Sequence, residues 1–368
     1  MPSSGNFAFQ FSTPAMEIER AVAELRFGRP VLFSEGERRL AVLALDCVAP
    51  EVYDQFASAV GGRHSLLLTA PRAGRLGIGA TGDATVPLDG VSFADASHLA
   101  YGLGAEAPAV WQSADPLVSR TAELARLALL LPAMVCADVT DDAAPFAACC
   151  ALHAGRLDGA DAGRQQFRQV ARTRVPLKNV GDAEFVVFRG GLAQKDQLAI
   201  VVGKPDFSRT MPIRIHSSCI TGDLFGSLKC DCGDQLRNGL VLLKQAGGGV
   251  LLYLDQEGRG TGIGAKMRAY GLQHLGLDTI DADAELGLAA DHRRYDAAIA
   301  MLRLLDISSV AMFTNNPTKI AALRDAGIAV ESRTAVTGTV TAENENYLRT
   351  KALRAGHMMD LATLTAAE

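Results

Sequence analysis

The sequence lacks a long apolar run, an export signal, an internal repeat and an excess of positive charge. Of its 368 residues, 48% are hydrophobic and 21% are charged, which is ordinary for a globular protein. No segment approaches the roughly 20 apolar residues that a membrane-spanning helix needs. The net charge of −5 argues against non-specific binding to nucleic acid. We therefore expect a cytoplasmic protein with no membrane partner and no nucleic-acid partner.

The length is sufficient for two domains. The first half alternates apolar segments of helical and strand character, which predicts an α/β layer fold. Gly, Asp, Arg and Ala interrupt the apolar periodicity at 155–164. We therefore predict a first domain over 1–155, a linker over 156–170 and a second domain over 171–368.

Apolar periodicity and short buried runs predict the individual elements. Helices are expected near 18–25, 52–60, 122–131, 235–245, 265–275 and 295–305. Strands are expected near 31–33, 40–45, 65–69, 134–139, 171–176, 183–189, 197–202, 249–254 and 310–313.

Three of the seven cysteines, Cys219, Cys230 and Cys232, lie within one short segment rich in Gly, Asp and Lys. Thiolates this close in sequence suit zinc. Three thiolates leave one position of a tetrahedron for water, as in catalytic sites, whereas His216 as a fourth ligand would make the site structural. The alternative is that they are ordinary buried cysteines, like the scattered Cys47, Cys136, Cys149 and Cys150.

A glycine-rich loop at 256–262 follows the predicted strand 249–254 and precedes a helix. Ligands bind at such strand ends in α/β sheets, and the glycines let backbone amides approach phosphate oxygens. Asp255 and Glu257 are candidate ligands for magnesium on a polyphosphate. The alternative is a tight turn without a ligand.

Further polar residues stand beside predicted helices. Pro317 suits the first position of a helix, and Lys319 in that first turn opposes the helix dipole unless an anion lies nearby. Asp291 is either a helix N-cap or a proton acceptor. Tyr270 is either a half-buried helix residue or one that orients a base or a water. Local positive charge that suits a small polyanion comes from Lys229, Arg237, Arg259, Lys266, Arg268, Arg293, Arg294 and Lys319.

Taken together and in this order, these segments resemble GTP cyclohydrolase II of riboflavin biosynthesis over residues 172–357. The resemblance implies a mixed sheet with helices, a homodimer, zinc, and magnesium bound with the substrate. It implies hydrolysis of GTP to a diaminopyrimidinone ribosylamine monophosphate, formate and pyrophosphate. The zinc ligands would be Cys219, Cys230 and Cys232. Catalytic residues would be Tyr270, Asp291 as proton acceptor and Arg293 as nucleophile. GTP contacts would be Arg214, Ile215, His216, Ser217, Ser218, Gln235, Glu257, Gly258, Arg259, Thr279, Thr314 and Lys319.

A nucleophilic role for Arg293 is chemically awkward, because a guanidinium stays protonated and has no free lone pair. Stabilisation of charge at the α-phosphate suits this residue better. The chain also departs from the family pattern at Ser218, where glutamate is usual, and at 261–265 in the glycine loop. These departures leave open a related enzyme acting on another nucleotide or on a nucleobase, for example in pyrimidine catabolism. A structural zinc knuckle that binds nucleic acid is a third hypothesis, which the missing fourth ligand and the acidic balance disfavour.

The first half resembles 3,4-dihydroxy-2-butanone 4-phosphate synthase through its opening helix, residues 25–33 and the strand–helix rhythm. That family binds magnesium with a carboxylate-rich loop. Here residues 34–39 carry Glu35 and Glu37 beside Arg38 and Arg39, and a hard cation has little to hold it. We therefore predict a degenerate synthase-like domain without that activity, which supports dimerisation or stability.

Overall fold

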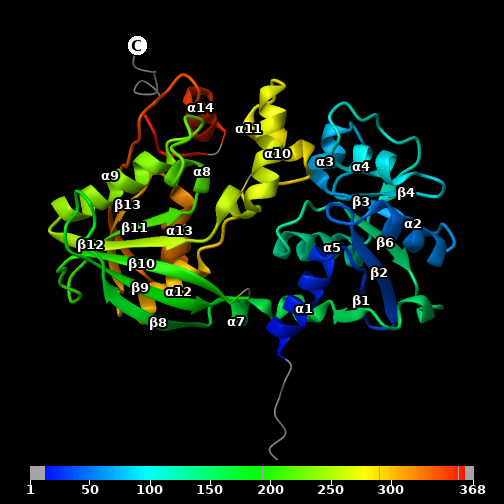
Figure 1. Cartoon of the computed structure of the whole chain (residues 1–368), viewed down its shortest axis with the longest axis horizontal. Coiled ribbons are helices and arrows are strands. Elements are labelled where there is room, and N and C mark those ends of the chain that lie inside the picture. Colours follow the sequence, from blue (N-terminus) through cyan, green and yellow to red (C-terminus); the bar gives the residue numbers. More distant parts are fainter. Residues whose placement is uncertain (1–12, 193, 290, 355, 361–368) are drawn as a thin grey trace, which may run out of the picture.

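The computed structural model describes residues 13–360 except 193, 290 and 355. Two lobes lie side by side, each built on a seven-stranded sheet flanked by helices (Figure 1). This arrangement confirms the predicted α/β fold class. The outer limits of the two predicted domains, residues 1 and 368, lie outside the described residues.

The first lobe has a mainly antiparallel sheet in the order β5-β4-β3-β6-β2-β1-β7, in which only β1 and β7 pair in parallel. Its strands are β1 Val31–Glu35, β2 Arg38–Ala44, β3 Ser65–Leu68, β4 Ala84–Pro87, β5 Gln112–Ser113, β6 Met134–Asp138 and β7 Cys150–His153. Its helices are α1 Pro14–Arg26, α2 Pro50–Ala59, α3 Ala70–Arg75, α4 Phe93–Tyr101, α5 Pro116–Leu127 and the 3-10 turn η1 Ala144–Phe146.

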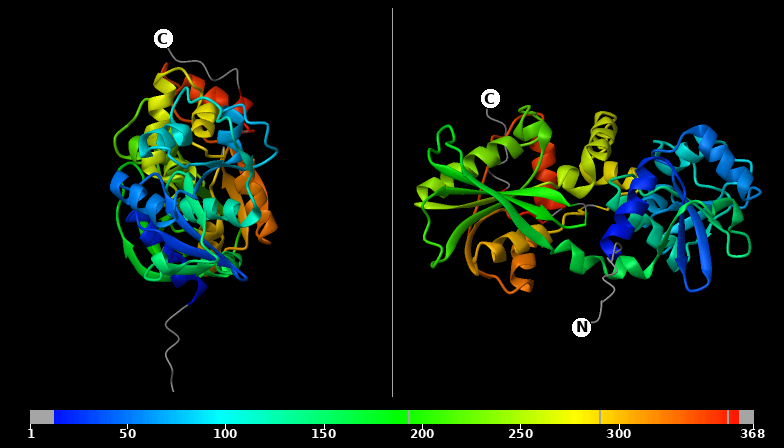
Figure 2. Two further views of the ribbon diagram at one scale, coloured as in Figure 1. Left: turned by 90° about the vertical axis from the view of Figure 1, so that its right-hand side faces the viewer. Right: turned by 60° about the horizontal axis from the view of Figure 1, so that its bottom comes forward.

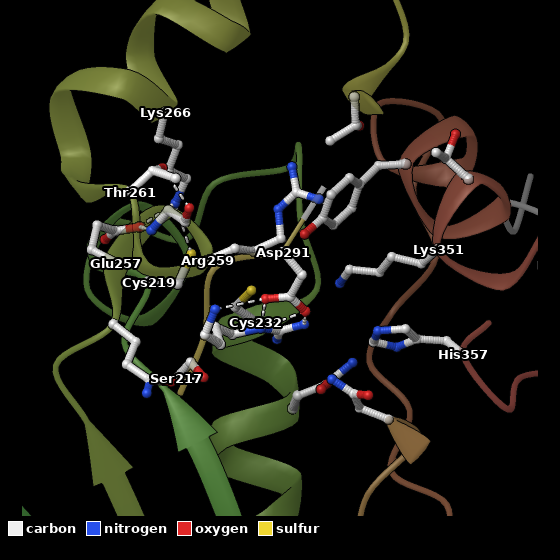
Figure 3. A pocket seen from close by; sticks show the side chains of 18 of the residues that line it. Ser217, Cys219, Cys232, Glu257, Arg259, Thr261, Lys266, Asp291, Lys351 and His357 are labelled. Carbon is white, nitrogen blue, oxygen red and sulfur yellow. Dashed lines mark hydrogen bonds and ion pairs between the residues drawn. The ribbon is translucent and has the colours of Figure 1, made fainter. Parts of the chain in front are cut away.

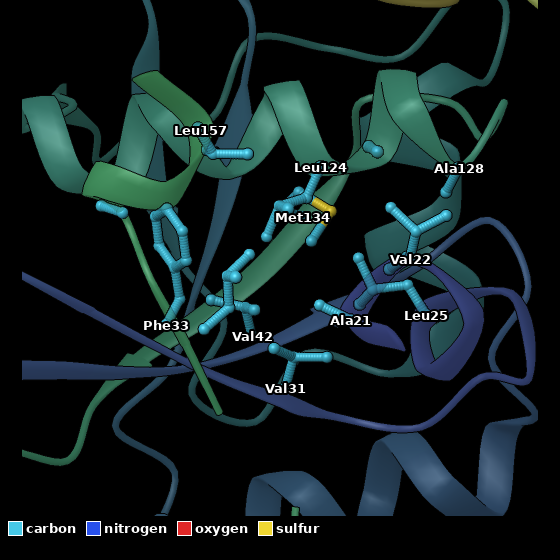
Figure 4. Close-up of a cluster of buried hydrophobic side chains, with 14 of the residues drawn as sticks. Ala21, Val22, Leu25, Val31, Phe33, Val42, Leu124, Ala128, Met134 and Leu157 are labelled. Carbon is cyan, nitrogen blue, oxygen red and sulfur yellow. The ribbon is translucent and has the colours of Figure 1, made fainter. Parts of the chain in front are cut away.

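Both faces of this sheet are buried. Successive side chains of a strand point to opposite faces, and β2 shows the consequence: Leu40 and Val42 join one apolar cluster, whereas Ala41 and Leu43 join the other. The first cluster packs β2 against α1 and α5 (Figure 4). With helices on both sides, the first lobe has a core of its own.

The second lobe has a mixed sheet in the order β14-β13-β11-β12-β10-β9-β8. Its strands are β8 Phe167–Arg174, β9 Ala183–Gly190, β10 Lys195–Gly203, β11 Met211–Ser217, β12 Gly248–Leu254, β13 Ser309–Phe313 and β14 Ala329–Thr334. Its helices are α8 Ile220–Asp223, α9 Cys232–Gln245, α10 Gly262–His274, α11 Thr279–Glu285, α12 Asp296–Leu304, α13 Pro317–Asp325 and α14 Glu345–Leu353, with the 3-10 turn η2 Glu257–Gly260. The pairs β8–β9, β9–β10 and β10–β12 are antiparallel, whereas β12, β11, β13 and β14 run parallel.

The parallel strands decide where a ligand can bind. Because β11, β12 and β13 run in the same direction, their carboxyl ends meet at one edge of the sheet, which is where α/β proteins bind ligands. The chain leaves these strands at Ser218, Asp255 and Thr314. Segments that are about a hundred residues apart in the sequence therefore share one edge.

Several boundaries differ from the sequence-based expectations. The helix expected from residue 122 begins at Pro116, because the Asp115 carboxylate accepts hydrogen bonds from the amides of Leu117 and Val118 at 2.9 and 3.1 Å. The segment predicted as a linker contains most of α6 Gly155–Asp158, α7 Ala160–Arg164 and the start of β8. None of the helices in the described part of the chain is both long and apolar enough to cross a membrane.

Candidate functional site

A cavity of about 360 Å³ lies at the carboxyl ends of β11, β12 and β13. Most of the residues predicted for the site line it: Arg214, His216, Ser217, Ser218, Cys219, Cys232, Gln235, Glu257, Gly258, Arg259, Tyr270, Thr279, Asp291, Arg293, Thr314 and Lys319. Two predicted residues do not. Ile215 is buried in the core of the sheet, and Cys230 is a buried member of the thiol cluster.

The three predicted cysteines form one cluster. Their sulfur atoms lie within 4.8 Å of one another, and the Sγ atoms of Cys219 and Cys230 are 3.7 Å apart. Tetrahedral zinc with sulfur ligands at about 2.3 Å holds neighbouring sulfurs about 3.8 Å apart, so the donor set fits zinc. Among the described residues this metal-ligand group consists of the three thiols and does not include His216.

Gly222 allows the thiols to approach each other. A Cβ atom at this position would lie 2.8 Å from Cys230 Sγ and 3.0 Å from Cys232 Cβ. Only a residue without a side chain fits there without displacing a sulfur atom.

The electrostatic environment favours a thiolate at Cys219. The hydrogen bond with Cys230 is the main cause that lowers the pKa of Cys219, and the Lys266 ammonium adds to it. Lys266 Nζ lies 3.1 Å from Cys219 Sγ and 2.9 Å from Glu257 Oε1. A thiolate is the form that binds metal.

Asp223 organises the strand end beside the thiols, and sequence reasoning did not single it out. One of its carboxylate oxygens accepts hydrogen bonds from the Cys219 amide at 3.0 Å and from the Tyr253 hydroxyl at 2.9 Å. The Nε2 atom of His216 lies 3.1 Å from both carboxylate oxygens. His216 thus faces Asp223, and burial lowers its pKa below the ordinary value.

The glycine-rich loop is held from both sides. Glu257 Oε2 accepts a hydrogen bond from the Ile220 amide at 2.6 Å, which ties the loop to the thiol segment. Ser218 Oγ accepts from the Gln256 amide at 3.1 Å. Asp255, by contrast, does not line this cavity and pairs with Lys195 at 2.7 Å. The two predicted magnesium carboxylates are therefore directed to different partners.

Arg259 has a strained backbone. Its φ of 59° and ψ of 33° place it in the left-handed region, which non-glycine residues adopt only when their surroundings require it. Its guanidinium forms an ion pair with Asp283 of α11. Burial raises the pKa of Asp283 to about 6, against the opposing effect of Arg259.

Asp291 and Arg293 form a pair in the wall of the cavity. Asp291 accepts hydrogen bonds from the amide and the Nε atom of Arg293, both at 2.9 Å. The N-cap interpretation of Asp291 is wrong, because α12 begins at Asp296 with Tyr295 at the cap. Burial acts to lower the pKa of Arg293, but the hydrogen bonds to Asp291 raise that pKa above its ordinary value. The guanidinium therefore stays charged.

Two further cations, both buried, line the cavity. Lys319, in the first turn of α13 after Pro317, donates to the Ile215 carbonyl at 2.7 Å. Arg214 donates to Gln235 at 2.8 Å. Burial, reinforced by Arg293 and Arg214, lowers the pKa of Lys319 well below its ordinary value. An anion bound here would relieve that repulsion, which supports the ligand predicted from the position of Lys319.

Tyr270 lies on α10 between two lysines. Lys229 Nζ is 5.1 Å and Lys266 Nζ is 5.7 Å from the centre of its ring. Burial raises the pKa of Tyr270, so its hydroxyl keeps its proton at neutral pH and can donate a hydrogen bond into the cavity that it lines.

Helix α14 and the segment after it complete the cavity, and sequence reasoning missed them. Lys351 and His357 face Asp291 across the opening (Figure 3). Lys351 Nζ lies 3.5 Å from Asp231 and 4.1 Å from the centre of the Tyr347 ring. Burial lowers the pKa of His357 to about 3, so this imidazole is neutral. Tyr347 and Lys351, four residues apart on α14, were the available signal.

In the first lobe, ion pairs with arginines engage Glu35 of the loop at 34–39 and two carboxylates outside that loop, Asp115 and Asp138. Glu35 lies 3.4 Å from Arg120, and Arg38 lies 2.9 Å from Asp115 and 3.0 Å from Asp138. Within the described residues, the only group of three or more metal-ligating side chains is the thiol cluster of the second lobe.

The sequence of this chain is similar to a known protein family and to several known proteins. A family model described as GTP cyclohydrolase II matches residues 168–335. The chain is 53% identical to a GTP cyclohydrolase-2 from Xylella fastidiosa (strain 9a5c) over 357 residues, which cover 96% of this chain and 90% of the relative. A GTP cyclohydrolase-2 from Azospirillum brasilense is 38% identical, with 93% of each chain covered.

Two other matches differ in extent. A GTP cyclohydrolase-2 from Pectobacterium atrosepticum is 43% identical. The match covers 99% of that relative but only 53% of this chain. A solved two-domain 3,4-dihydroxy-2-butanone 4-phosphate synthase from A. baumannii aligns with 87% of this chain and 99% of its own, at 17% identity and a TM-score of 0.30.

Proposed function

The chain belongs to the GTP cyclohydrolase II family, and from this premise we propose how its second lobe acts. In this proposal the second lobe hydrolyses GTP to 2,5-diamino-6-(5-phosphoribosylamino)pyrimidin-4-one, formate and pyrophosphate, which is the first step of riboflavin biosynthesis. The observation that carries the proposal is a three-thiol cluster open to a cavity lined by Arg214, Arg259, Arg293 and Lys319. A cationic cavity of this kind suits a triphosphate.

The thiols of Cys219, Cys230 and Cys232 would hold zinc. Bound there, zinc would supply a Lewis acid that activates water at neutral pH. Asp223 orients this region because its carboxylate accepts a hydrogen bond from the Cys219 amide. Lys266 offsets the negative charge of the thiolates. Glu257 ties the phosphate-side loop to the same segment.

The remaining residues bind and orient the nucleotide. Arg293 stays charged, so its proposed role is to stabilise charge at the α-phosphate rather than to attack it. Asp291 keeps Arg293 in place, and it lies in the cavity where it can accept a proton. Tyr270 and Lys351 line the same cavity. The Asp255 carboxylate is paired with Lys195, so we do not assign it to magnesium. The proposed magnesium ion binds to the polyphosphate of the substrate and enters the cavity with it.

We further propose that the first lobe forms no 3,4-dihydroxy-2-butanone 4-phosphate, because its loop at 34–39 offers only Glu35 and Glu37 as carboxylates and Glu35 pairs with Arg120. A cytoplasmic location and a homodimer belong to the same proposal. The relative from Pectobacterium atrosepticum corresponds to about half of this chain, which supports assigning the cyclohydrolase chemistry to one lobe.

The test is to incubate the zinc-loaded full chain with GTP and magnesium, and to measure formate, pyrophosphate and the ultraviolet spectrum of the base. Formate and pyrophosphate should appear together while the purine absorbance is replaced by that of a diaminopyrimidine. Cys230→Ser should lose zinc and formate release, whereas Cys149→Ser, outside the cluster, should keep both. Intact GTP with zinc bound would refute the proposal and direct attention to other nucleotides and nucleobases.

A further inference from the structure

Helix α11 belongs to the cavity and to the interface between the lobes. Thr279 and Asp283 line the cavity, whereas Glu285 at its last turn reaches the first lobe. Figure 1 and the right-hand view of Figure 2 show α10 and α11 between the lobes, and α11 packs beside α3. Because a helix of seven residues is too short to be stable alone, its position depends on what packs against it.

The first lobe grips α11 through a buried ion pair. Arg72 of α3 lies 2.7 Å from Glu285, and the two side chains are 1% and 6% exposed. The same guanidinium donates to the carbonyls of Leu99 and Gly102 at 3.0 and 2.8 Å. Since Arg72 is tied to the end of α4, it has little freedom to follow a displaced Glu285.

Two other contacts act in the same place. The Thr69 hydroxyl donates to the Gly287 carbonyl at 2.7 Å, just beyond the end of α11. Leu131 of the first lobe packs with Ala282 and Leu286 in a small apolar cluster. The end of α11 is therefore held by polar and apolar contacts from the first lobe.

The opposite face of α11 holds Arg259. Asp283 lies two residues before Glu285 and pairs with the Arg259 guanidinium. The left-handed backbone of Arg259 makes its position dependent on such support. A shift of α11 would release Asp283, and Arg259 would leave the cavity wall.

We propose that Arg72 and Glu285 are positioning residues for GTP binding: the first lobe fixes α11 through this pair, and α11 fixes Arg259 through Asp283. This inference rests on the function proposed above and assigns the first lobe a role in it. Breaking the pair should weaken substrate binding and leave the thiol cluster intact, because the cluster is held by Asp223 and Glu257, which belong to the second lobe.

The experiment compares full-chain Glu285→Gln and Arg72→Met with wild type in formate-release kinetics, zinc content and melting temperature. We expect KM for GTP to rise on the order of tenfold, the effect of losing one charge-assisted contact, with kcat and zinc content unchanged. Glu285→Asp, which keeps the charge, should recover part of the affinity. Arg120→Met is the matched control, because Arg120 of the same lobe pairs with Asp158 at 2.6 Å and Glu35 at 3.4 Å and not with α11; its KM should stay near wild type.

A double variant tests the route. If Arg72 acts through Asp283, then Arg72→Met combined with Asp283→Asn should bind GTP no more weakly than Asp283→Asn alone. A lower melting temperature with a wild-type KM in both Glu285→Gln and Arg72→Met would overturn the inference and leave the pair a purely structural contact. The inference would also be overturned if the effects of Arg72→Met and Asp283→Asn on KM simply add in the double variant.

The two proposals fail in different ways. Absence of formate from the wild-type chain would refute the cyclohydrolase function. The positioning role would then still be tested by the rise in melting temperature that GTP itself produces, which should be smaller in Glu285→Gln than in wild type.

Discussion

Gly222→Ala tests whether the three thiols form a metal site with the geometry that the structure gives them. The added Cβ would lie 2.8 Å from Cys230 Sγ, whereas ordinary contact begins at 3.4 Å. The sulfur or the backbone of α8 must therefore move by about 0.6 Å. Metal–ligand distances tolerate only about 0.2 Å, so the variant should lose zinc rather than adjust to it.

Gly222→Ala should affect the stability of the fold less than it affects zinc binding. An added methyl in a packed site costs about 1–3 kcal/mol of unfolding free energy, which leaves most domains folded. The expected result is a folded chain whose zinc content, measured by mass spectrometry after dialysis, falls well below one per chain. Formate release should fall in proportion to the zinc.

Gly264→Ala is the control for glycine replacement itself. A Cβ there meets nothing within 4 Å, and alanine in a helix is favoured over glycine by about 0.5–1 kcal/mol. This variant should keep its zinc and gain slightly in stability. A Gly222→Ala protein that retains full zinc and activity would refute the assignment of the thiol cluster as a tightly constrained metal site.

Three further predictions concern the cavity and the first lobe. Lys351→Met should raise KM for GTP about tenfold through loss of a charged contact, whereas Lys244→Met, whose ammonium meets a backbone carbonyl outside the cavity, should not. Protonation of Asp283 as the pH falls through about 6 removes the charge that holds Arg259, so KM should rise on the acid side. That acid limb should be absent from the pH profile of Asp283→Asn, and its persistence there would exclude Asp283 as its origin. Asp115→Ala removes the N-cap of α5 and should lower the unfolding free energy by about 1–2 kcal/mol, measured by urea denaturation, with KM unchanged.

Local sequence patterns determined the elements and part of the site. The apolar run of β12 and the glycine loop after it were both predicted, because the strand and the turn depend on neighbouring residues. The spacing of Cys219, Cys230 and Cys232 sufficed to predict a metal site for the same reason: all three thiols lie on one short segment. Pro317 likewise marked the start of α13, since its fixed φ suits the first turn of a helix.

The distant segments that complete the site are brought together by packing, which no local pattern predicts. Asp291 resembled an N-cap by its position before an apolar helix, yet it pairs with Arg293 because α12 starts later. Lys351 lines the cavity because α14 packs against α11, and nothing local to Lys351 specifies that packing. The contact of α3 with Glu285 joins residues 210 positions apart. Such pairings depend on how two lobes pack together, so they are properties of the assembled fold and not of any segment of the sequence.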